Sequence, residues 1–301
     1  MDDSIKDFFW VLFFLLITAV VWYKTGGPNN PGATSGPFLD RPVEKATEEF
    51  VKATPGLEKT RSQVIITPKA IIDPIDQKPV LESTHKDEIS LSVGYASRQT
   101  DPQKEYIEIT ASRNNLNPLM ITEWTVEGKN GLDIKIGKGT YLPLLGQVSI
   151  QDNIFLHPGE KAIIMTGESP IGTSFRLNQC TGYFEQFQDF IPSLPKKCPY
   201  LEDEEIPNEH GFNDSCLDYI DRLPNCKIQL TVPTTLNPIC QKFIKNTLTY
   251  PSCVNLHKND PDFYGSEWRI YLNRSEELWK SKRETIILRD ETGAIIDWKS
   301  Y

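Results

Sequence analysis

The sequence predicts a mainly β protein that carries a helical, cysteine-rich insertion and an N-terminal transmembrane helix. Three observations lead to this fold class. Apolar and polar residues alternate in short segments such as Glu105–Ala111, which is the period of a half-buried strand. All six cysteines lie between Cys180 and Cys253, and Phe8–Tyr23 is an uncharged apolar run. The 22 prolines and 18 glycines of the 301-residue chain favour turn-rich β structure over a helical bundle.

The apolar run Phe8–Tyr23 predicts a single-span membrane anchor at residues 1–24. As a helix it would be about 24 Å long, slightly shorter than the hydrocarbon core of a bilayer, and aromatic residues near its ends suit the membrane interfaces. A cleavable signal peptide is the competing interpretation, but aspartates precede the run and no small-residue cleavage site follows it. A buried core helix explains the run poorly, because the run is apolar on all faces.

Residues 25–62 are expected to form a flexible linker with a short helix. The segment Lys24–Pro37 is rich in Gly, Pro and Asn and lacks apolar residues for a core. Within Pro42–Thr54, apolar residues recur at helical spacing, and Pro55 with Gly56 ends the pattern.

Residues 63–301 are predicted to form one β-sandwich that is interrupted by the insertion at about 167–265. Three prolines break Gln63–Leu81, which excludes a central strand and fits extended edge segments. Trp124 lies inside an alternating pattern and is interpreted as a core ring. Further strands and apolar segments are predicted at Ile89–Ala96, Glu105–Ala111, Met120–Val126, Leu132–Ile136, Val148–Leu156, Ala162–Met165, Trp268–Leu272, Thr285–Arg289 and Ala294–Tyr301.

Three motifs follow one another along these strands. They are E-Y-I-E-I with an Asn-rich turn and a tryptophan, the turn L-H-P-G-E before an apolar run, and the closing pattern L-R-D-x-x-G-x-x-x-D. Their order and spacing resemble the lamin-tail domain, an immunoglobulin-like β-sandwich of nuclear lamins and many bacterial surface proteins. The resemblance covers about Ile89–Thr166 and Trp268–Tyr301, and it implies a binding or adaptor module without catalytic residues. The motif residues are Tyr106, Ile107, Trp124, Pro158, Gly159, Asp290, Gly293 and Asp297.

The cysteine pattern predicts disulfides in an oxidising compartment, because the count is even and no C-x-x-C pair occurs. A zinc site would need cysteines in closely spaced pairs, whereas consecutive cysteines here are at least 10 positions apart. Reduced, buried thiols are the alternative, and the spacing does not choose a pairing. Disulfides place the body of a single-pass membrane protein outside the cytoplasm. The candidates are Cys180, Cys198, Cys216, Cys226, Cys240 and Cys253.

Within the insertion, apolar residues at helical intervals predict helices at Asp214–Arg222 and Pro238–Asn246. The other apolar residues of the insertion are few and scattered, so a poor core that depends on disulfides is expected. Because the insertion joins two strands, it should lie at one end of the sandwich, where loops gather and binding usually occurs.

The sequence supplies no motif for a cofactor, a metal ion or a catalytic nucleophile. The four histidines are dispersed, and His157 is interpreted as a surface or capping residue. A net charge of −9 argues against nucleic acid as a partner, because a nucleic-acid footprint needs clustered Lys and Arg. The acidic run Glu202–Glu205 is interpreted as a solvated loop.

Three functions are compatible with these patterns. The favoured one is a membrane-anchored, extracytoplasmic lamin-tail-like module that binds a protein or glycan surface partner through its insertion, with no cofactor and no catalysis. The second is an exported hydrolase with a carboxylate pair in the insertion. The third is a structural envelope component without a discrete ligand. The conformation of residues 167–265 distinguishes them best, because a ligand requires a concave surface there.

Overall fold

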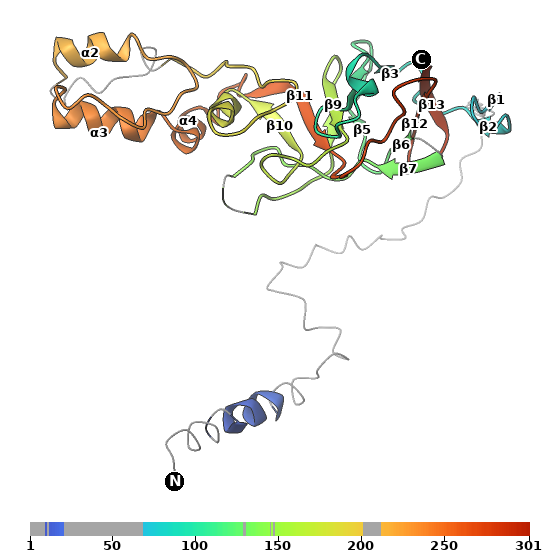
Figure 1. Ribbon diagram of the computed structural model, residues 1–301, viewed down its shortest axis with the longest axis horizontal. Helices are drawn as coiled ribbons and strands as arrows, with labels where there is room; N and C mark the ends of the chain where they lie inside the picture. The colour runs from blue at the N-terminus through green and yellow to red at the C-terminus, as the bar shows by residue number, and fades with distance from the viewer. Residues whose placement is uncertain are drawn as a thin grey trace, which may run out of the picture. The chain divides into compact units, whose positions relative to one another are not determined.

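The computed structural model describes residues 10, 12–20, 69–128, 131–144, 146, 148–200 and 212–301. The chain divides into two units, Met1–Gln63 and Val64–Tyr301. In the first unit, residues 10 and 12–20 are helical (Figure 1). Within the described residues, no helix has both the length and the apolar character needed to cross a membrane. The predicted linker and short helix at 25–62 lie outside the described residues.

The second unit contains a five-stranded sheet in the order β10-β11-β9-β4-β3. Neighbouring strands are antiparallel except β9 and β11, which are parallel. Residues Ile107 and Ile164 are register partners of β4 and β9, and Leu91 of β3 pairs with Ile109. The strands are β3 (Ile89–Ser92), β4 (Tyr106–Ala111), β9 (Lys161–Met165), β10 (Phe175–Asn178) and β11 (Tyr264–Tyr271).

A four-stranded antiparallel sheet has the order β13-β12-β6-β7. Its strands are β6 (Thr125–Gly128), β7 (Leu132–Lys135), β12 (Thr285–Arg289) and β13 (Ile295–Ser300). Two small ribbons pair β1 (Ala70–Ile72) with β2 (Pro79–Leu81) and β5 (Leu119–Met120) with β8 (Phe155–Leu156). The β1–β2 ribbon is joined to β13 by a bridge between Glu82 and Ile295. The proline-rich segment therefore lies beside an edge strand, as expected from its prolines.

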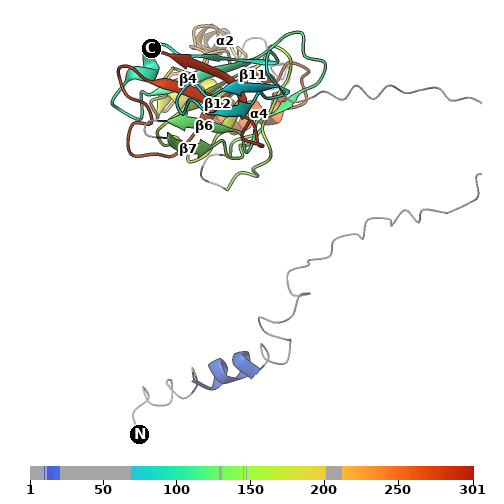
Figure 2. The same cartoon turned by 90° about the vertical axis from the view of Figure 1, so that its right-hand side faces the viewer.

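The two large sheets face each other across one hydrophobic core (Figure 2). Strand β4 shows how the sequence produces this arrangement, since Ile107 and Ile109 are fully buried while the alternating positions are half-buried. Trp124, Trp268 and Trp279 fill the centre of the core. The prediction of a mainly β protein with multiple sheets is confirmed, whereas the immunoglobulin-like topology remains a prediction.

The outer face of the five-stranded sheet carries a second hydrophobic cluster, which it shares with the insertion. Ile163 and Met165 of β9 and Phe175 of β10 point into this cluster. Strand β9 is therefore covered on both faces, which explains why its sequence, KAIIM, is a continuous apolar run and does not alternate. The expectation of a poor core in the insertion is wrong, because its own buried side chains form most of this cluster and the sheet strands complete it.

The described part of the insertion contains three short α-helices that begin at side-chain caps. They are α2 (Asp214–Ile220), α3 (Pro238–Thr247) and α4 (Tyr250–His257). The side chains of Asn213, Asn237 and Thr249 accept hydrogen bonds from backbone N–H groups in the first turns. Helices α2 and α3 occupy the segments where helices were expected, and they share a third small hydrophobic cluster at the end of the unit opposite β13 (Figure 1).

Three details differ from the predicted strand pattern. The predicted strand Met120–Val126 is divided between β5 and β6, which belong to different sheets, because a turn at Thr122 and Glu123 separates them. Strand β10 lies inside the segment 167–265 that was assigned to the insertion, and it pairs with β11 as part of the large sheet. The apolar segment Val148–Leu156 contributes only β8, while Val148 is 96% and Ile150 82% exposed. Neither side chain has a facing sheet to cover it, so apolar composition alone misplaced this segment.

Candidate binding surface

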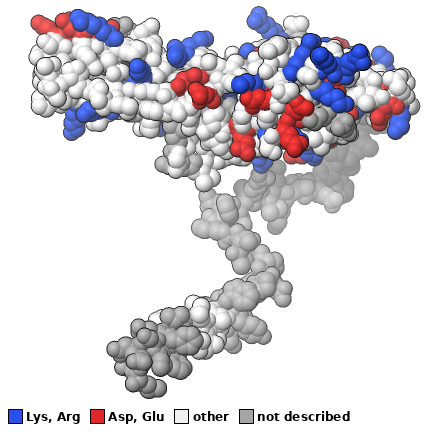
Figure 3. Space-filling view, viewed as in Figure 1, with Lys and Arg blue, Asp and Glu red and all other residues white. Residues whose placement is uncertain are grey.

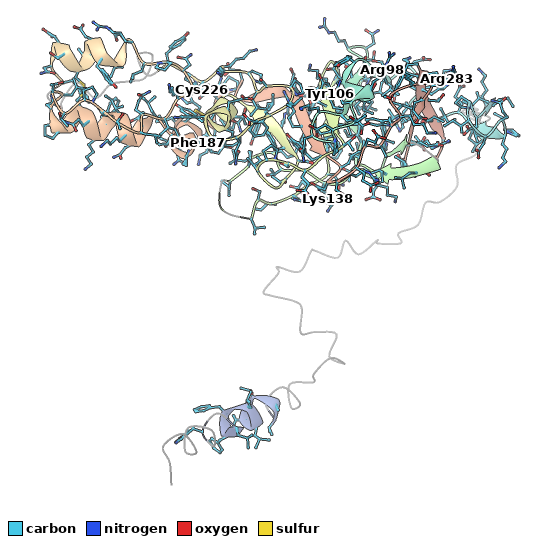
Figure 4. All side chains as sticks on the ribbon, in the orientation of Figure 1. Arg98, Tyr106, Lys138, Phe187, Cys226 and Arg283 are labelled. Carbon is cyan, nitrogen blue, oxygen red and sulfur yellow. A yellow bond between two sulfur atoms is a disulfide. The ribbon has the colours of Figure 1, made fainter. Side chains whose placement is uncertain are left out.

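Three disulfides join the six cysteines, as the sequence predicted. The pairs are Cys180–Cys253, Cys198–Cys226 and Cys216–Cys240, and no cysteine is free. The first two bridges lie in the cluster between the insertion and the sheet, where Figure 4 labels Cys226, and the third joins α2 to α3. The first bridge therefore ties α4 to the segment that follows β10, the second joins two loops within the insertion, and the third closes the distal helical hairpin.

Arg269 of β11 fixes one loop of the insertion to the sheet. Its side chain is 2% exposed, and Nε donates to Oε1 of Glu267 at 2.6 Å. The guanidinium also donates to the carbonyl oxygens of Pro192 and Ser193, the latter at 3.3 Å. A buried guanidinium needs such partners to offset its loss of hydration. The loop is thereby held in one position against the outer face of the sheet.

A cleft of about 380 Å³ opens where β10 and β11 meet the insertion. This volume is in the range of clefts that bind small molecules or short segments of larger ligands. Asn178 shapes one wall, because its side chain accepts from the N–H of Cys180 at 2.9 Å and donates to the hydroxyl of Tyr250 at 3.4 Å. The lining residues are Leu177, Asn178, Gln179, Thr181, Pro195, Lys197, Asp262, Phe263, Gly265, Ser266 and Glu267.

The charged side chains that line this cleft are Glu267, Lys197 and Asp262. Glu267 forms ion pairs with Arg269 and with Lys161 at 3.3 Å, so its carboxylate is already neutralised by two cations. Lys197 and Asp262 lie at the exposed rim. A glycosidase would need a pair of carboxyl groups on either side of the scissile bond, whereas the Glu267 carboxylate is already bound by two cations.

Two carboxylates do converge in the four-stranded sheet, but Arg289 lies between them. Its Nη2 is 2.7 Å from Asp73 and 2.7 Å from Glu127. Burial raises the pKa of the Glu127 carboxyl despite the bond from Arg289. Burial also acts to raise the pKa of Asp73, but hydrogen bonds from Arg289 and from backbone N–H groups outweigh it and lower that pKa. The cluster of Asp73, Glu127 and Arg289 joins the β1–β2 ribbon to the four-stranded sheet and lies outside the insertion.

The E-Y-I-E-I motif serves the fold. Ile107 is in the sandwich core, and Tyr106 packs on the cluster of the opposite face. Glu105 is fully buried, and its carboxylate accepts from the N–H groups of Leu278 at 2.6 Å and Trp279 at 3.1 Å. Burial raises the pKa of this carboxyl, and the two backbone hydrogen bonds oppose the rise.

Trp124 is a core ring, fully buried, and its Nε1 donates to Oε2 of Glu291 at 3.0 Å. In the L-H-P-G-E turn, Pro158 is exposed and Gly159 adopts φ +83°. A side chain at Gly159 would be strained there and would also crowd Arg113. Glu160, which the sequence analysis did not single out, closes the turn by accepting from the N–H of His157 at 3.0 Å and forms an ion pair with Arg176 of β10.

The closing motif forms the β12–β13 turn. Oδ1 of Asp290 accepts from the N–H groups of Thr292 at 2.8 Å and Ala294 at 3.1 Å, while Gly293 adopts φ +85°. Burial acts to raise the pKa of Asp290, but the hydrogen bonds that its carboxylate accepts outweigh burial and lower the pKa. The largest of these contributions comes from the hydrogen bond with Ser83.

Asp297 joins the two sheets at their edges. Its Oδ2 accepts from the N–H of Leu91 in β3 at 2.8 Å, and its Oδ1 accepts from the N–H of Trp298 in β13 at 2.7 Å. Strands β3 and β13 are the outer strands of their sheets. The carboxylate therefore occupies N–H groups that could otherwise pair with a strand of another molecule.

A groove of about 550 Å³ follows this β3–β13 edge. Lys86 forms an ion pair with Glu82, and Nζ of Lys299 is 3.3 Å from Asp297. Arg113 is exposed and makes no ion pair within the described part of the chain. The lining residues are Lys86, Asp87, Ile89, Ser90, Thr110, Ala111, Ser112, Arg113, Ile296, Asp297 and Lys299. The sequence analysis missed this groove, because its walls come from segments that are distant in sequence.

Among the described residues, no group of three or more His, Cys, Asp or Glu side chains is arranged to hold a metal ion. Comparisons of the chain with protein-family models, curated proteins and solved structures give no match. The similarity to the lamin-tail domain thus depends on the three motifs alone, and the structure gives their residues roles in turns, edges and the core.

Proposed function

We propose that this protein is a membrane-anchored binding module without catalytic activity, whose body lies in an extracytoplasmic, oxidising compartment. The observation that supports this location best is the pairing of all six cysteines within one insertion. Disulfides of this number persist in secreted and surface proteins and are rare in the cytosol. The run Phe8–Tyr23 would supply the anchor.

The partner would bind the insertion. The cleft at its base is held open by Arg269 and by two disulfides, so it requires little ordering when a ligand enters. Its distal hairpin exposes apolar side chains, including Leu230 and Ile239. A polar cleft at the base and exposed apolar residues on the distal hairpin suit a protein or glycan of the cell surface. The lamin-tail-like motifs agree with an adaptor role.

The anchor is tested by fractionating cells that produce the full chain or residues 38–301. The full chain should sediment with membranes and be released only by detergent, and the shorter chain should be soluble. Recovery of the full chain in the soluble fraction would contradict the anchor. Protease added to intact cells should degrade the body of the full chain, and complete protection would contradict its extracytoplasmic position.

The binding surface is tested by screening residues 38–301 on glycan and surface-protein arrays. The variant Lys197→Ala, Asp262→Ala changes the rim of the cleft without altering net charge. The matched variant Lys135→Ala, Asp133→Ala removes the same two charges from exposed positions on β7. Loss of a ligand in the first variant alone would support the insertion cleft. If both variants keep the ligand, the binding site lies outside the insertion cleft. If the arrays reveal no ligand, a purely structural role is favoured.

A further inference from the structure

The loop before β12 presents three cations for which the described part of the chain supplies no ion-pair partner. Lys280, Lys282 and Arg283 are exposed, and within the described residues none of them forms an ion pair. Arg98, from the short 3-10 helix Ala96–Arg98, is also exposed and forms no ion pair with any described residue. Figure 3 shows Lys and Arg gathered at the end of the unit that carries β3 and β13, and Figure 4 labels Arg98 and Arg283 there.

The backbone of this loop is fixed by acidic residues whose carboxylates point inward. Glu105 accepts from the N–H groups at the start of the loop, as described above. Glu284 accepts from the N–H of Lys280 at 3.0 Å and from that of Thr285 at 3.1 Å. The acids thus bond to the backbone, while the cations extend into solvent. This separation creates a positive surface on a chain whose net charge is −9.

Tyr301 brings Arg98 to this loop. Its hydroxyl lies 2.7 Å from the carbonyl oxygen of Ser97 and 3.0 Å from that of Lys280, and it can donate to either. The guanidinium of Arg98 is 4.5 Å from the centre of the Tyr301 ring, a cation–π distance that keeps the charge in place. Tyr301 therefore holds Arg98 next to the backbone of Lys280, at the start of the cationic loop.

The positive surface continues into the groove along the β3–β13 edge. Asp297, in the groove, and Tyr301, at the loop, lie four positions apart on one extended segment, which corresponds to about 13 Å. Lys299 lies between them, and Lys86 and Arg113 line the far end of the groove. The Asp297 carboxylate is bound to two backbone N–H groups, so it opposes an anionic ligand less than a free carboxylate would.

We propose that this edge, from Arg113 through Lys299 to the Lys280–Arg283 loop, binds an extended anionic polysaccharide. Arg113 at one end of the groove and the loop cations at the other fit a linear chain of charged sugars, whereas Lys86 and Lys299 between them are offset by Glu82 and Asp297. Ser90, Thr110 and Ser112 supply polar groups for the hydroxyls of the sugars. A flat bilayer surface would reach the loop but not the floor of the groove. This surface is distinct from the insertion cleft, so its test is independent of that cleft.

The test uses the full chain in a neutral detergent, with heparin oligosaccharides as the probe and uncharged dextran as the negative control. The variant Lys280→Ala, Lys282→Ala, Arg283→Asn removes the loop charges, and asparagine suits position 283 because its φ is +54°. The control variant Lys242→Ala, Lys245→Ala, Lys258→Ala removes three exposed lysines from the region of α3 and α4 and has the same net charge. Far-UV circular dichroism confirms that both variants fold.

We expect the loop variant to bind heparin at least roughly tenfold more weakly and the control to stay within about twofold of the wild type. The slope of log affinity against log salt should fall by about two to three in the loop variant. Equal losses in both variants would overturn the proposal, because bulk charge alone would then explain binding. Nanodiscs of equal phosphatidylcholine and phosphatidylserine provide the membrane alternative. Binding to these discs but not to heparin would also overturn it.

Discussion

Replacing Trp124 by alanine should destabilise the second unit by about 3–5 kcal/mol. The ring is fully buried among the side chains of both sheets. A buried tryptophan removes about 200 Å² from water, which at about 25 cal/mol per Å² corresponds to about 5 kcal/mol as an upper value. Measured truncations of core aromatics span about 3–5 kcal/mol. Loss of the hydrogen bond to Glu291 adds little to the destabilisation, because water hydrates that exposed carboxylate in the variant.

The assay is urea unfolding followed by far-UV circular dichroism, with the disulfides kept oxidised. The same substitution at Trp298 is the matched control, because this ring is 44% exposed on β13 and its removal should cost less than about 1 kcal/mol. The denaturant slope should not change, so that the shift in midpoint reports stability. Similar destabilisation by both variants, or no change for Trp124→Ala, would refute the assignment of Trp124 as the centre of the core.

Further predictions concern the disulfides and the buried charges. Cys216→Ser with Cys240→Ser should loosen only the α2–α3 hairpin, by about 3.5 kcal/mol for a sequence separation of 24, and hydrogen exchange should rise there while the sheets stay protected. Protection lost throughout the unit would argue against a separate hairpin. Burial raises the folded-state pKa of Glu105, so its contribution to stability is complete below the unfolded pKa and is lost as pH rises through the folded pKa. The cost of Glu105→Gln should therefore shrink between about pH 4 and pH 7, and a cost that grows would contradict this. Arg289→Met should cost about 3 kcal/mol in urea unfolding, because two carboxylates remain without their cation, and a neutral effect would contradict the role of that cluster.

Alternation of apolar and polar residues in the sequence correctly predicted strand β4 and the buried position of Trp124. Strand β4 was found because its buried positions alternate, and Trp124 was placed in the core for the same reason. The disulfides were predicted from the even count and wide spacing of the cysteines. Each of these inferences uses residues that are close in sequence or a property of the whole chain.

Features formed by distant segments were missed. Strand β10 has only four residues, and its partner β11 follows the whole helical part of the insertion, so no local period reveals it. The core of the insertion was underestimated because Ile163 and Met165 of the sheet complete it. The run Lys280–Arg283 is cationic in the sequence, but only the structure shows that the acids Glu105 and Glu284 bond to backbone N–H groups of this loop.

The central claim is that the insertion is fastened by disulfides and presented outside the cytoplasm. Peptide mapping by mass spectrometry, without reduction, of the full chain purified from its native cells tests it most directly. Alkylation at lysis must trap any free thiol before oxidation can occur. We predict three linked peptide pairs, Cys180–Cys253, Cys198–Cys226 and Cys216–Cys240, and no alkylated cysteine. Six alkylated cysteines would contradict both the disulfides and the extracytoplasmic position inferred from them.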